Sequence, residues 1–369
     1  MRDVLERVQE FADRTEPVVV CSVVNTRGST PQKPGAMMVV LPAGGQIGTL
    51  GGGCVEAEVR REALRLLSAA DSDHALLSFH LDNDYGWDDG LICGGRMYVL
   101  AERVDAAEKA EYFAAMFELA RLGRGFTEAV CLAERGGAAA GARVLFDAEG
   151  GLRAALRVDG NALDLRARLR PLAERPRPYE AEGWAFSPHW PRCRLIIAGA
   201  GHVGKALARY AAEADFEVWV IDDRADYASR ERFPHAERLI VGDIGAELRK
   251  VPCDEHTCVV IVTRGHNHDE EALHAVVDRP FGFIGMIGSR RKVRLIFEDL
   301  AALGVAPELL QRVRAPIGLN IASRTVPEIA VSILAELIAF RNGADLPEEA
   351  FLHARGMPTR RFAQPACRG

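Results

Sequence analysis

The chain has 369 residues, of which 48% are hydrophobic and 27% are charged, with a formal net charge of -6 and a pI near 6.0. This length favours two domains, the composition is typical of a well-cored globular protein, and the slight acidity argues against a nucleic-acid partner. No apolar run approaches the roughly 18 residues that a membrane-spanning helix needs. Residues 1–7 are charged and amphipathic, unlike a signal peptide. We therefore expect a cytoplasmic protein with no membrane partner.

The first third of the chain predicts an α+β domain. A short amphipathic helix at the start is followed by β-branched and apolar runs at 17–24 and 36–41, which are typical of strands. A Gly-Gly turn then leads into a third strand-like run at 46–50. Apolar residues in helical spacing from Val55 to Leu67 predict a helix after the glycines at 51–53.

The rest of the chain predicts a second domain of a different class. Residues 106–190 carry no motif that we can assign, although a strand and turn at 144–151 indicate that part of this region extends the first domain, and the Pro-rich stretch 170–191 is predicted to be a linker. Beyond it, almost wholly apolar runs alternate with helical patterns, which predicts a doubly wound, Rossmann-like parallel sheet. The expected strands are 194–198, 217–221, 238–241, 258–262 and 282–287. We thus expect domains at 1–190 and 191–345, followed by a tail at 346–369.

A glycine fingerprint opens the second domain. Gly199, Gly201 and Gly204 lie between an apolar strand and an amphipathic helix, where such glycines allow a tight turn, the approach of a phosphate and close helix packing. Asp222 ends the next strand, about 20 positions on, where an acid can bind an adenine-ribose hydroxyl. This pattern predicts nucleotide binding, and Arg224 leaves NAD or NADP open. Alternatively, the turn is only scaffold.

Two polar runs follow later strands of the same predicted sheet. The run 263–270 contains His266 and His268, which could coordinate a metal or handle protons, although the acids there also suit a helix N-terminus. The run 287–292 is a Gly-Ser turn with three cations. Arg290 is its candidate contact to a phosphate or carboxylate, and a solvated helix start is the alternative.

Cysteines beside glycines mark the first domain. Cys54 follows Gly51, Gly52 and Gly53 and precedes a predicted helix, whose N-terminus stabilises a thiolate, with Arg60 and Arg61 as possible further support. Cys93 precedes another glycine pair, Gly94-Gly95. The spacing of the eight cysteines in the chain fits no zinc ribbon, and the alternative for each is a small buried apolar residue.

A loop between the first two strands is a third candidate element. Residues 27–35 combine hydroxyls with two cations, Arg27 and Lys33, in a segment fixed by proline and glycine. Backbone N–H groups in such a loop can hold an anion, and a rigid connector is the alternative.

These segments, taken in order, resemble the XdhC/CoxI family. The first domain carries the resemblance at 28–38, 51–56 and 93–95, and the second domain at 199–204, 285–292 and 316–338. Two positions depart from the family pattern: Gln32 stands where a basic residue is frequent, and Ala322 stands where a glycine is frequent.

The resemblance implies a chaperone for molybdenum cofactor rather than a catalyst. Family members are taken to bind this molybdopterin, to aid its sulfuration with a cysteine desulfurase, and to deliver it to an apo-hydroxylase of the xanthine dehydrogenase type. By this reasoning Cys54 and Cys93 contact the metal or relay sulfur, and a thiolate suits so soft a site. Self-association as a dimer or other homo-oligomer is also expected, although the apolar helix predicted at 326–339 fits the core better than an interface.

Two other functions remain open from the sequence. The glycine fingerprint alone would fit an NAD(P)-dependent oxidoreductase, but no clear hydride-transfer constellation accompanies it. A pure scaffold, in which the Rossmann half docks a partner and neither cysteine acts, is the second alternative.

Overall fold

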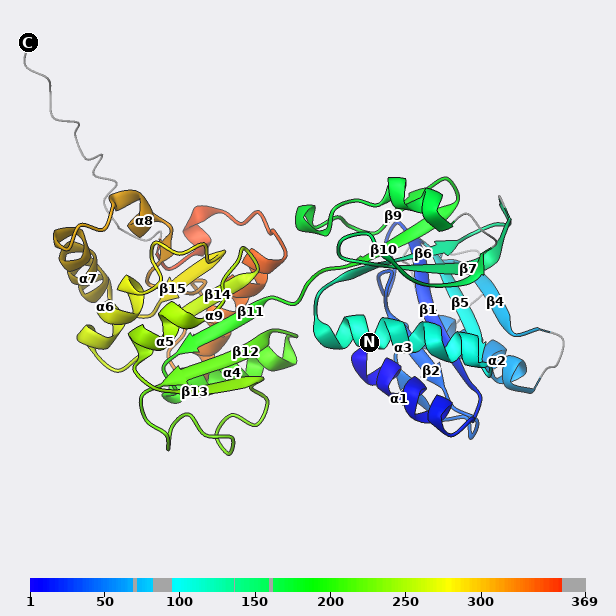
Figure 1. Cartoon of the computed structure of the whole chain (residues 1–369), viewed down its shortest axis with the longest axis horizontal. Helices are drawn as coiled ribbons and strands as arrows, with labels where there is room; N and C mark the ends of the chain where they lie inside the picture. Colours follow the sequence, from blue (N-terminus) through cyan, green and yellow to red (C-terminus); the bar gives the residue numbers. More distant parts are fainter. Residues whose placement is uncertain (69–71, 82–94, 136, 159–161, 354–369) are drawn as a thin grey trace, which may run out of the picture. The chain divides into compact units, whose positions relative to one another are not determined.

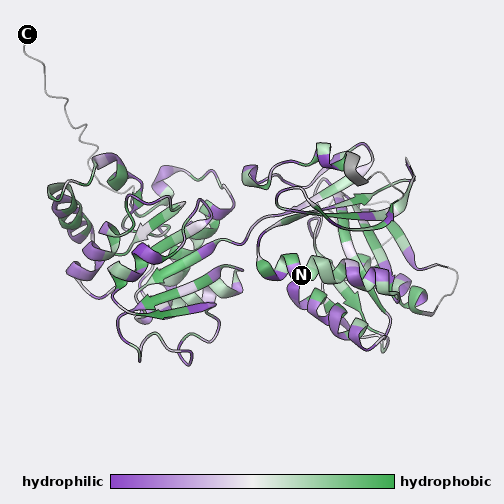
Figure 2. Cartoon of the chain, in the orientation of Figure 1, coloured by the Kyte–Doolittle hydropathy of each residue, from purple (hydrophilic) through white to green (hydrophobic). Residues whose placement is uncertain are grey.

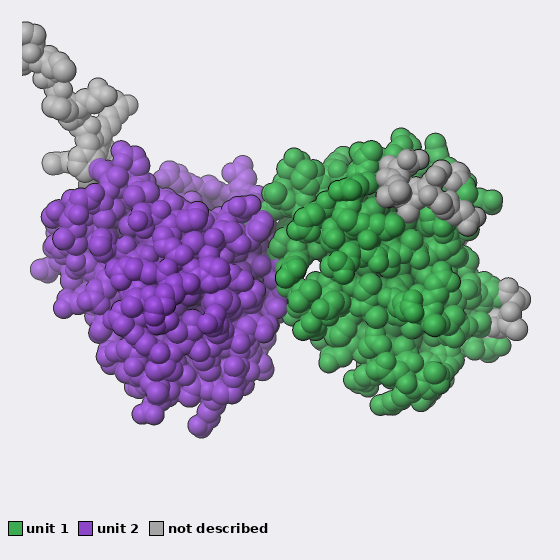
Figure 3. Space-filling model, viewed as in Figure 1, with its two compact units in different colours: residues 1–191 green, residues 192–369 purple. Residues whose placement is uncertain are grey.

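The chain folds into two compact units, Met1–Pro191 and Arg192–Gly369, called here the N-terminal and the C-terminal unit (Figure 3). The computed structural model describes residues 1–68, 72–81, 95–135, 137–158 and 162–353. Antiparallel sheets with helices form the first unit and a parallel sheet with helices forms the second, which confirms the predicted fold class. Within the described ranges, no helix is long and apolar enough to cross a membrane.

The first sheet of the N-terminal unit is antiparallel, with strand order β3-β2-β1-β5-β4. Val19, Cys21 and Val23 of β1 face helix α2, while Val18 and Val20 alternate toward α1 and α3 on the other side. Helices therefore cover both faces, and the predicted strands and helices of this region are confirmed. The elements are α1 (Arg2–Asp13), β1 (Val18–Arg27), β2 (Met37–Val40), β3 (Gln46–Gly48), α2 (Gly53–Ser68), β4 (His74–His80), β5 (Arg96–Val104) and α3 (Ala107–Leu122) (Figure 1).

A second antiparallel sheet, in the order β8-β7-β6-β10-β9, completes this unit. The linker predicted at 170–191 is not a linker, because this stretch forms β9 and β10 and buries Trp184 and Phe186 in the core. Pro188 is tolerated because it lies next to the end of β10, opposite Thr127. The elements are β6 (Phe126–Cys131), β7 (Ala138–Asp147), β8 (Leu152–Val158), the 3₁₀ helices η1 (Ala162–Arg168) and η2 (Leu172–Glu174), β9 (Tyr179–Ala181) and β10 (Trp184–His189).

A buried charge network joins the two sheets. Arg143 of β7 is fully buried and donates to Glu102 of β5 at 2.7 Å, to Ser22 of β1 at 2.9 Å and to Glu128 of β6. Tyr112 of α3 also donates to Glu128, at 2.9 Å. Since each buried charge has an opposite partner, the desolvation cost of the network is offset only while all its members are present.

The C-terminal unit is built on a parallel sheet in the order β13-β12-β11-β14-β15-β16. One face packs against α4 and α9 and the other against α5 to α8, which is the doubly wound arrangement predicted. Figure 2 shows these strands mainly in the hydrophobic colour. The elements are β11 (Arg194–Ala198), α4 (His202–Glu213), β12 (Glu217–Asp222), β13 (Arg238–Val241), α5 (Ile244–Lys250), β14 (Thr257–Ile261), α6 (His266–His274), β15 (Phe283–Met286), α7 (Arg290–Ala302), α8 (Pro307–Gln311), β16 (Val313–Arg314) and α9 (Val326–Arg341).

Helix α9 belongs to the core, as its apolar composition predicted. Ala330, Ile333 and Leu337 are buried against the sheet and α4. The helix begins with a capping box in which Thr325 and Glu328 satisfy each other's backbone N–H groups. After α9, the chain returns through η3 (Glu348–Ala350) and pairs with the loop around Gly318–Asn320.

Candidate functional site

The structure brings the three motifs of the N-terminal unit together. Gly51 packs so closely on the loop 28–35 that an added Cβ would lie 2.5 Å from Cβ of Pro31. Gly95 lies against the same loop, where a Cβ would be 2.1 Å from the carbonyl oxygen of Ser29. These glycines are therefore required by the close approach of segments that are far apart in the sequence, and the segments form one site.

The glycine turn before α2 has one side open. Gly51, Gly52 and Gly53 have φ values of 107°, 75° and 65°, a left-handed conformation that favours glycine. A Cβ on Gly52 would meet no atom within 4 Å, in contrast to one on Gly51. A ligand can thus approach the backbone of the turn at Gly52.

Glu56 of α2 holds this turn in place. Its carboxylate accepts hydrogen bonds from the amides of Leu50 at 2.9 Å and Gly52 at 3.1 Å, and from the side chains of Thr49 at 2.7 Å and Gln46 at 2.6 Å. Partial burial alone would raise the pKa of Glu56, but these hydrogen bonds lower it overall. The sequence reasoning missed Glu56, although an acid in the first turn of a helix after a glycine run is a recognisable signal.

Cys54 lies at the start of α2 and is partly buried. The two arginines expected to support its thiolate have other partners: Arg60 donates to the carbonyl of Gly44 at 2.6 Å, and Arg61 pairs with Glu58. Of the two predicted sources of thiolate stabilisation, the arginines and the helix N-terminus, only the helix N-terminus therefore remains. Cys93 lies outside the described residues, and its role stays a prediction.

The glycine fingerprint of the C-terminal unit has the expected backbone. An added Cβ on Gly199 would lie 2.5 Å from the carbonyl oxygen of Val262, and one on Gly204 would lie 2.0 Å from that of Gly199. A Cβ on Gly201, in contrast, would meet nothing within 4 Å. The turn thus packs tightly on the loop after β14 and leaves Gly201 open at the start of α4.

Asp222 secures this turn rather than facing an open space. One carboxylate oxygen accepts from the amide of Ala200 at 2.7 Å, and the guanidinium of Arg224 contacts both oxygens, at 2.8 and 3.0 Å. Burial alone would raise the pKa of Asp222, but these bonds lower it overall. A ribose would have to displace Arg224, so the nucleotide contact of Asp222 stays a prediction.

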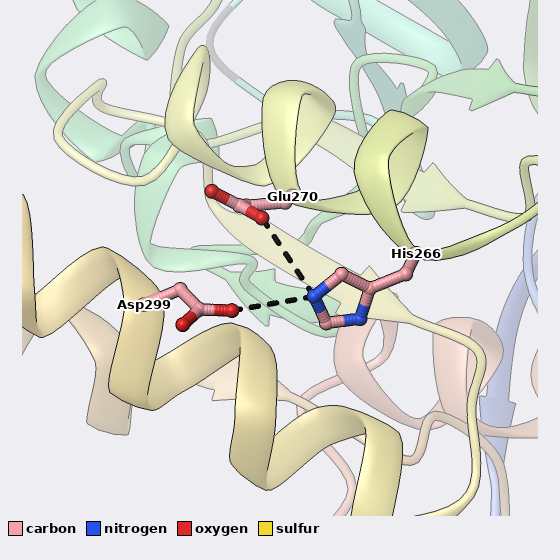
Figure 4. A group of neighbouring side chains, drawn as sticks. All are labelled: His266, Glu270 and Asp299. Carbon is pink, nitrogen blue, oxygen red and sulfur yellow. Dashed lines mark hydrogen bonds and ion pairs between the residues drawn. The ribbon is translucent and has the colours of Figure 1, made fainter.

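Helix α6, which begins shortly after β14, carries both predicted histidines, but they have different neighbours. His266 faces Glu270 of its own helix and Asp299 of α7 (Figure 4), whereas Nδ1 of His268 lies 4.0 Å from Glu271. Asp269, the residue after His268, is fully buried and pairs with Lys292 of α7. Arg290 is exposed at the start of α7, where Ser289 caps the helix, and its anion contact stays a prediction.

Two family models match the chain. The model described as the XdhC and CoxI family matches residues 11–80, which include the loop 28–35 and the Gly51–Cys54 turn. The model described as the XdhC Rossmann domain matches residues 195–337, which include the glycine fingerprint and both polar runs. The chain belongs to the XdhC and CoxI family.

Individual relatives of this XdhC and CoxI chain agree with the family models. It is 27% identical to a Bacillus subtilis protein described as a probable xanthine dehydrogenase subunit, over 88% of this chain and 94% of that protein. It is 25% identical to PaoD of Escherichia coli, a molybdenum cofactor insertion chaperone, over 92% of this chain and 88% of that protein. The uncharacterized protein YqeB of Escherichia coli is 38% identical over 43% of this chain, and the aligned part is only 29% of YqeB.

The fold is shared with a solved structure. A crystal structure from Bacillus halodurans, described as a xanthine dehydrogenase, matches with a TM-score of 0.75 over 94% of this chain and 98% of that chain. The sequence identity is 24%, so this likeness establishes the fold of the XdhC and CoxI chain and no more.

Proposed function

We propose that this protein is an accessory factor that binds molybdenum cofactor and assists its sulfuration and insertion into a hydroxylase of the xanthine dehydrogenase type. The observation that carries the proposal is the convergence of the loop 28–35, the turn Gly51–Cys54 and Gly95 on one site. The named relatives, one a molybdenum cofactor insertion chaperone, support it over most of the chain.

The chemistry of the converged site suits this cargo. The cofactor joins a soft, sulfur-ligated metal to a pterin that carries a phosphate, and a thiolate at a helix N-terminus is a soft ligand. The amides of Leu50, Gly51 and Gly52 already donate to Glu56 and Thr49, so the turn offers the cofactor an unobstructed approach at Gly52 and not free N–H groups. Glu56 keeps the turn in this conformation without occupying the space above Gly52.

Cys54 is the residue that we assign to the metal or to sulfur transfer. As a relay, its thiolate would attack the outer sulfur of a persulfide on a cysteine desulfurase, and the donor cysteine would leave as a thiolate. Cys93, shortly before Gly95 in the sequence, is the second thiol proposed for this site. Nucleotide binding at Gly199–Gly204 and self-association remain separate predictions.

Transfer to a client enzyme tests this function. The cofactor-loaded protein is mixed with an apo-hydroxylase of the xanthine dehydrogenase type, and the hydroxylase activity that appears is measured. We expect Cys54→Ala to reduce activation strongly and Cys253→Ala, which removes another partly buried thiol far along the chain, to match the wild type. Equal activation by Cys54→Ala and the wild type would remove Cys54 from the mechanism.

A further inference from the structure

Three potential metal ligands meet at the N-terminus of α6. Nε2 of His266 lies 3.3 Å from Oδ2 of Asp299 and 3.7 Å from Oε2 of Glu270. One donor atom from each of the three residues lies within 4.8 Å of the other two. Figure 4 shows both carboxylates directed at the same edge of the imidazole ring, Glu270 from α6 and Asp299 from α7.

This spacing is close to that of a coordination sphere. Ligand atoms about 2.0–2.2 Å from an ion such as Zn²⁺ lie roughly 3–3.5 Å from one another at the angles of a tetrahedral or octahedral site. His266 and Asp299, 3.3 Å apart, already meet this condition, and the 3.7 Å between His266 and Glu270 exceeds it only slightly. His266 and Glu270 are four residues apart on one helix, which places both on the same face.

The charge around the cluster favours a cation. Two carboxylates face one imidazole, and among the residues that the structure describes, no lysine or arginine forms an ion pair with Glu270 or Asp299. Two cations of α7 pair elsewhere: Lys292 with Asp269, and Arg294 with Glu298. A divalent ion would balance the two carboxylates and leave the imidazole neutral.

We propose that His266, Glu270 and Asp299 bind a divalent first-row transition metal ion that links α6 to α7. One imidazole nitrogen with two carboxylate oxygens suits Zn²⁺ and Mn²⁺, and Zn²⁺ binds more tightly at equal availability. The side chains of His266 and Asp299 are 36% and 52% exposed, so the remaining coordination positions face solvent. Water or an anionic oxygen of a ligand, such as a phosphate, would fill them.

His268 provides a matched control. It is as exposed as His266, at 38% against 36%, and lies on the same helix turn. Because residues two apart on a helix point in different directions, it does not share the face of His266 and Glu270. Its ion-pair neighbour is Glu271 instead.

Metal titration of the full-length, metal-free protein tests the site. Zn²⁺ binding is measured by calorimetry, and Mn²⁺ binding, which thiols do not favour, by the loss of its free-ion electron paramagnetic resonance signal. We expect His266→Ala and Asp299→Asn to lower affinity for both ions by at least about tenfold, because the loss of a group that only hydrogen-bonds to a metal ligand already costs that much. His268→Ala should bind like the wild type.

Thermal unfolding of the same variants gives a second readout, because an ion that binds only the folded state raises the unfolding temperature. The wild type and His268→Ala should be stabilised by added metal, while correctly folded His266→Ala should not. Equal weakening by His268→Ala, unchanged affinity in His266→Ala, or no Mn²⁺ binding by the wild type would overturn the proposal. None of these readouts depends on molybdenum cofactor, so they stand apart from the proposed function.

Discussion

The two glycine turns of this protein are held in the same way but present different chemistry. In the N-terminal unit Glu56 accepts from the amides of Leu50 and Gly52, and in the C-terminal unit Asp222 accepts from the amide of Ala200. Each turn opens a helix, and each keeps one glycine unobstructed. The first turn leads directly to a thiol, whereas the carboxylate of the second is shared with an arginine. A glycine turn held by a carboxylate thus precedes a thiol in one unit and a charged sheet edge in the other.

The largest effect should come from the buried charge network that joins the two sheets of the N-terminal unit. Arg143→Ala leaves Glu102 and Glu128 buried without their guanidinium, and removing one partner of a buried ion pair costs about 3–5 kcal/mol. Urea denaturation followed by circular dichroism should show this loss. Arg121→Ala, which breaks an exposed pair with Glu118, is the control and should cost at most about 1 kcal/mol. Similar losses in both variants would contradict the role given to the buried network.

The next effect separates the tight glycine from the open one. Gly51→Ala and Gly52→Ala both place a side chain in the left-handed region, but only Gly51→Ala also creates a clash, with Pro31. Gly51→Ala should therefore be less stable than Gly52→Ala by about 1–3 kcal/mol, the usual cost of overpacking. Thermal unfolding of the two variants measures the difference. Equal stability would mean that the loop 28–35 does not pack on the turn as described.

The N-terminal unit should lose stability gradually on acidification because of His189. Burial, and then the positive charge of the chain's amino group, lower the pKa of His189 to about 4. Between about pH 6.5, the ordinary pKa of histidine, and pH 4, the unfolded chain binds a proton that the folded N-terminal unit does not. Stability contributed by neutral His189 is complete above this window and falls as the pH falls through it. In urea denaturation at a series of pH values, His189→Gln should make the free energy of unfolding depend less on pH. An unchanged pH dependence would mean that other groups cause it.

The C-terminal unit should respond less to the same change. Burial and then Arg314 lower the pKa of His353 to about 4, but burial raises the pKa of Glu336, whose Oε1 lies 3.9 Å from the imidazole. A raised carboxyl pKa adds stability at low pH and loses it as pH rises through the folded-state value, which opposes the histidine. Glu336→Gln should therefore make stability fall more steeply on acidification. If stability fell less steeply in that variant than in the wild type, Glu336 would not oppose His353 in this way.

The smallest effect concerns a departure from the family pattern. Ala322 has a φ of 57°, in the left-handed region, where the resemblance suggests a glycine. Ala322→Gly removes that strain at some cost in chain entropy, so we expect a net gain of about 0.5–1 kcal/mol. Chemical denaturation should resolve this gain in the free energy of unfolding, and a loss of stability would contradict the prediction.

The sequence predicted the parts of the fold that leave a local pattern and missed parts that do not. The parallel sheet was predictable because its strands are short apolar runs, as in Leu195–Ala198, and the glycine fingerprint lies between a strand and a helix. Of the second sheet of the N-terminal unit, only the strand and turn at 144–151 were predicted. Strands β9 and β10 were missed because they lie within a Pro-rich stretch whose composition is also typical of a linker.

In the candidate site the sequence identified Cys54 and the glycines but not the role of Glu56, and it also missed the buried network around Arg143. The hydrogen bond from Arg143 to Ser22 joins residues 121 positions apart, and no local pattern encodes such a partner. The convergence of Pro31, Gly51 and Gly95 likewise depends on tertiary packing. His266 was a candidate from the polar run 263–270, but its partner Asp299 was not, because Asp299 comes from another helix.

Cofactor retention tests the central claim most directly. The wild type, Cys54→Ala and Cys253→Ala are purified from a molybdenum-replete host, and molybdenum and pterin are quantified on each. We predict near-stoichiometric molybdopterin on the wild type and on Cys253→Ala, and little on Cys54→Ala. Equal molybdopterin on all three proteins, or none on the wild type, would contradict a cofactor site at Cys54.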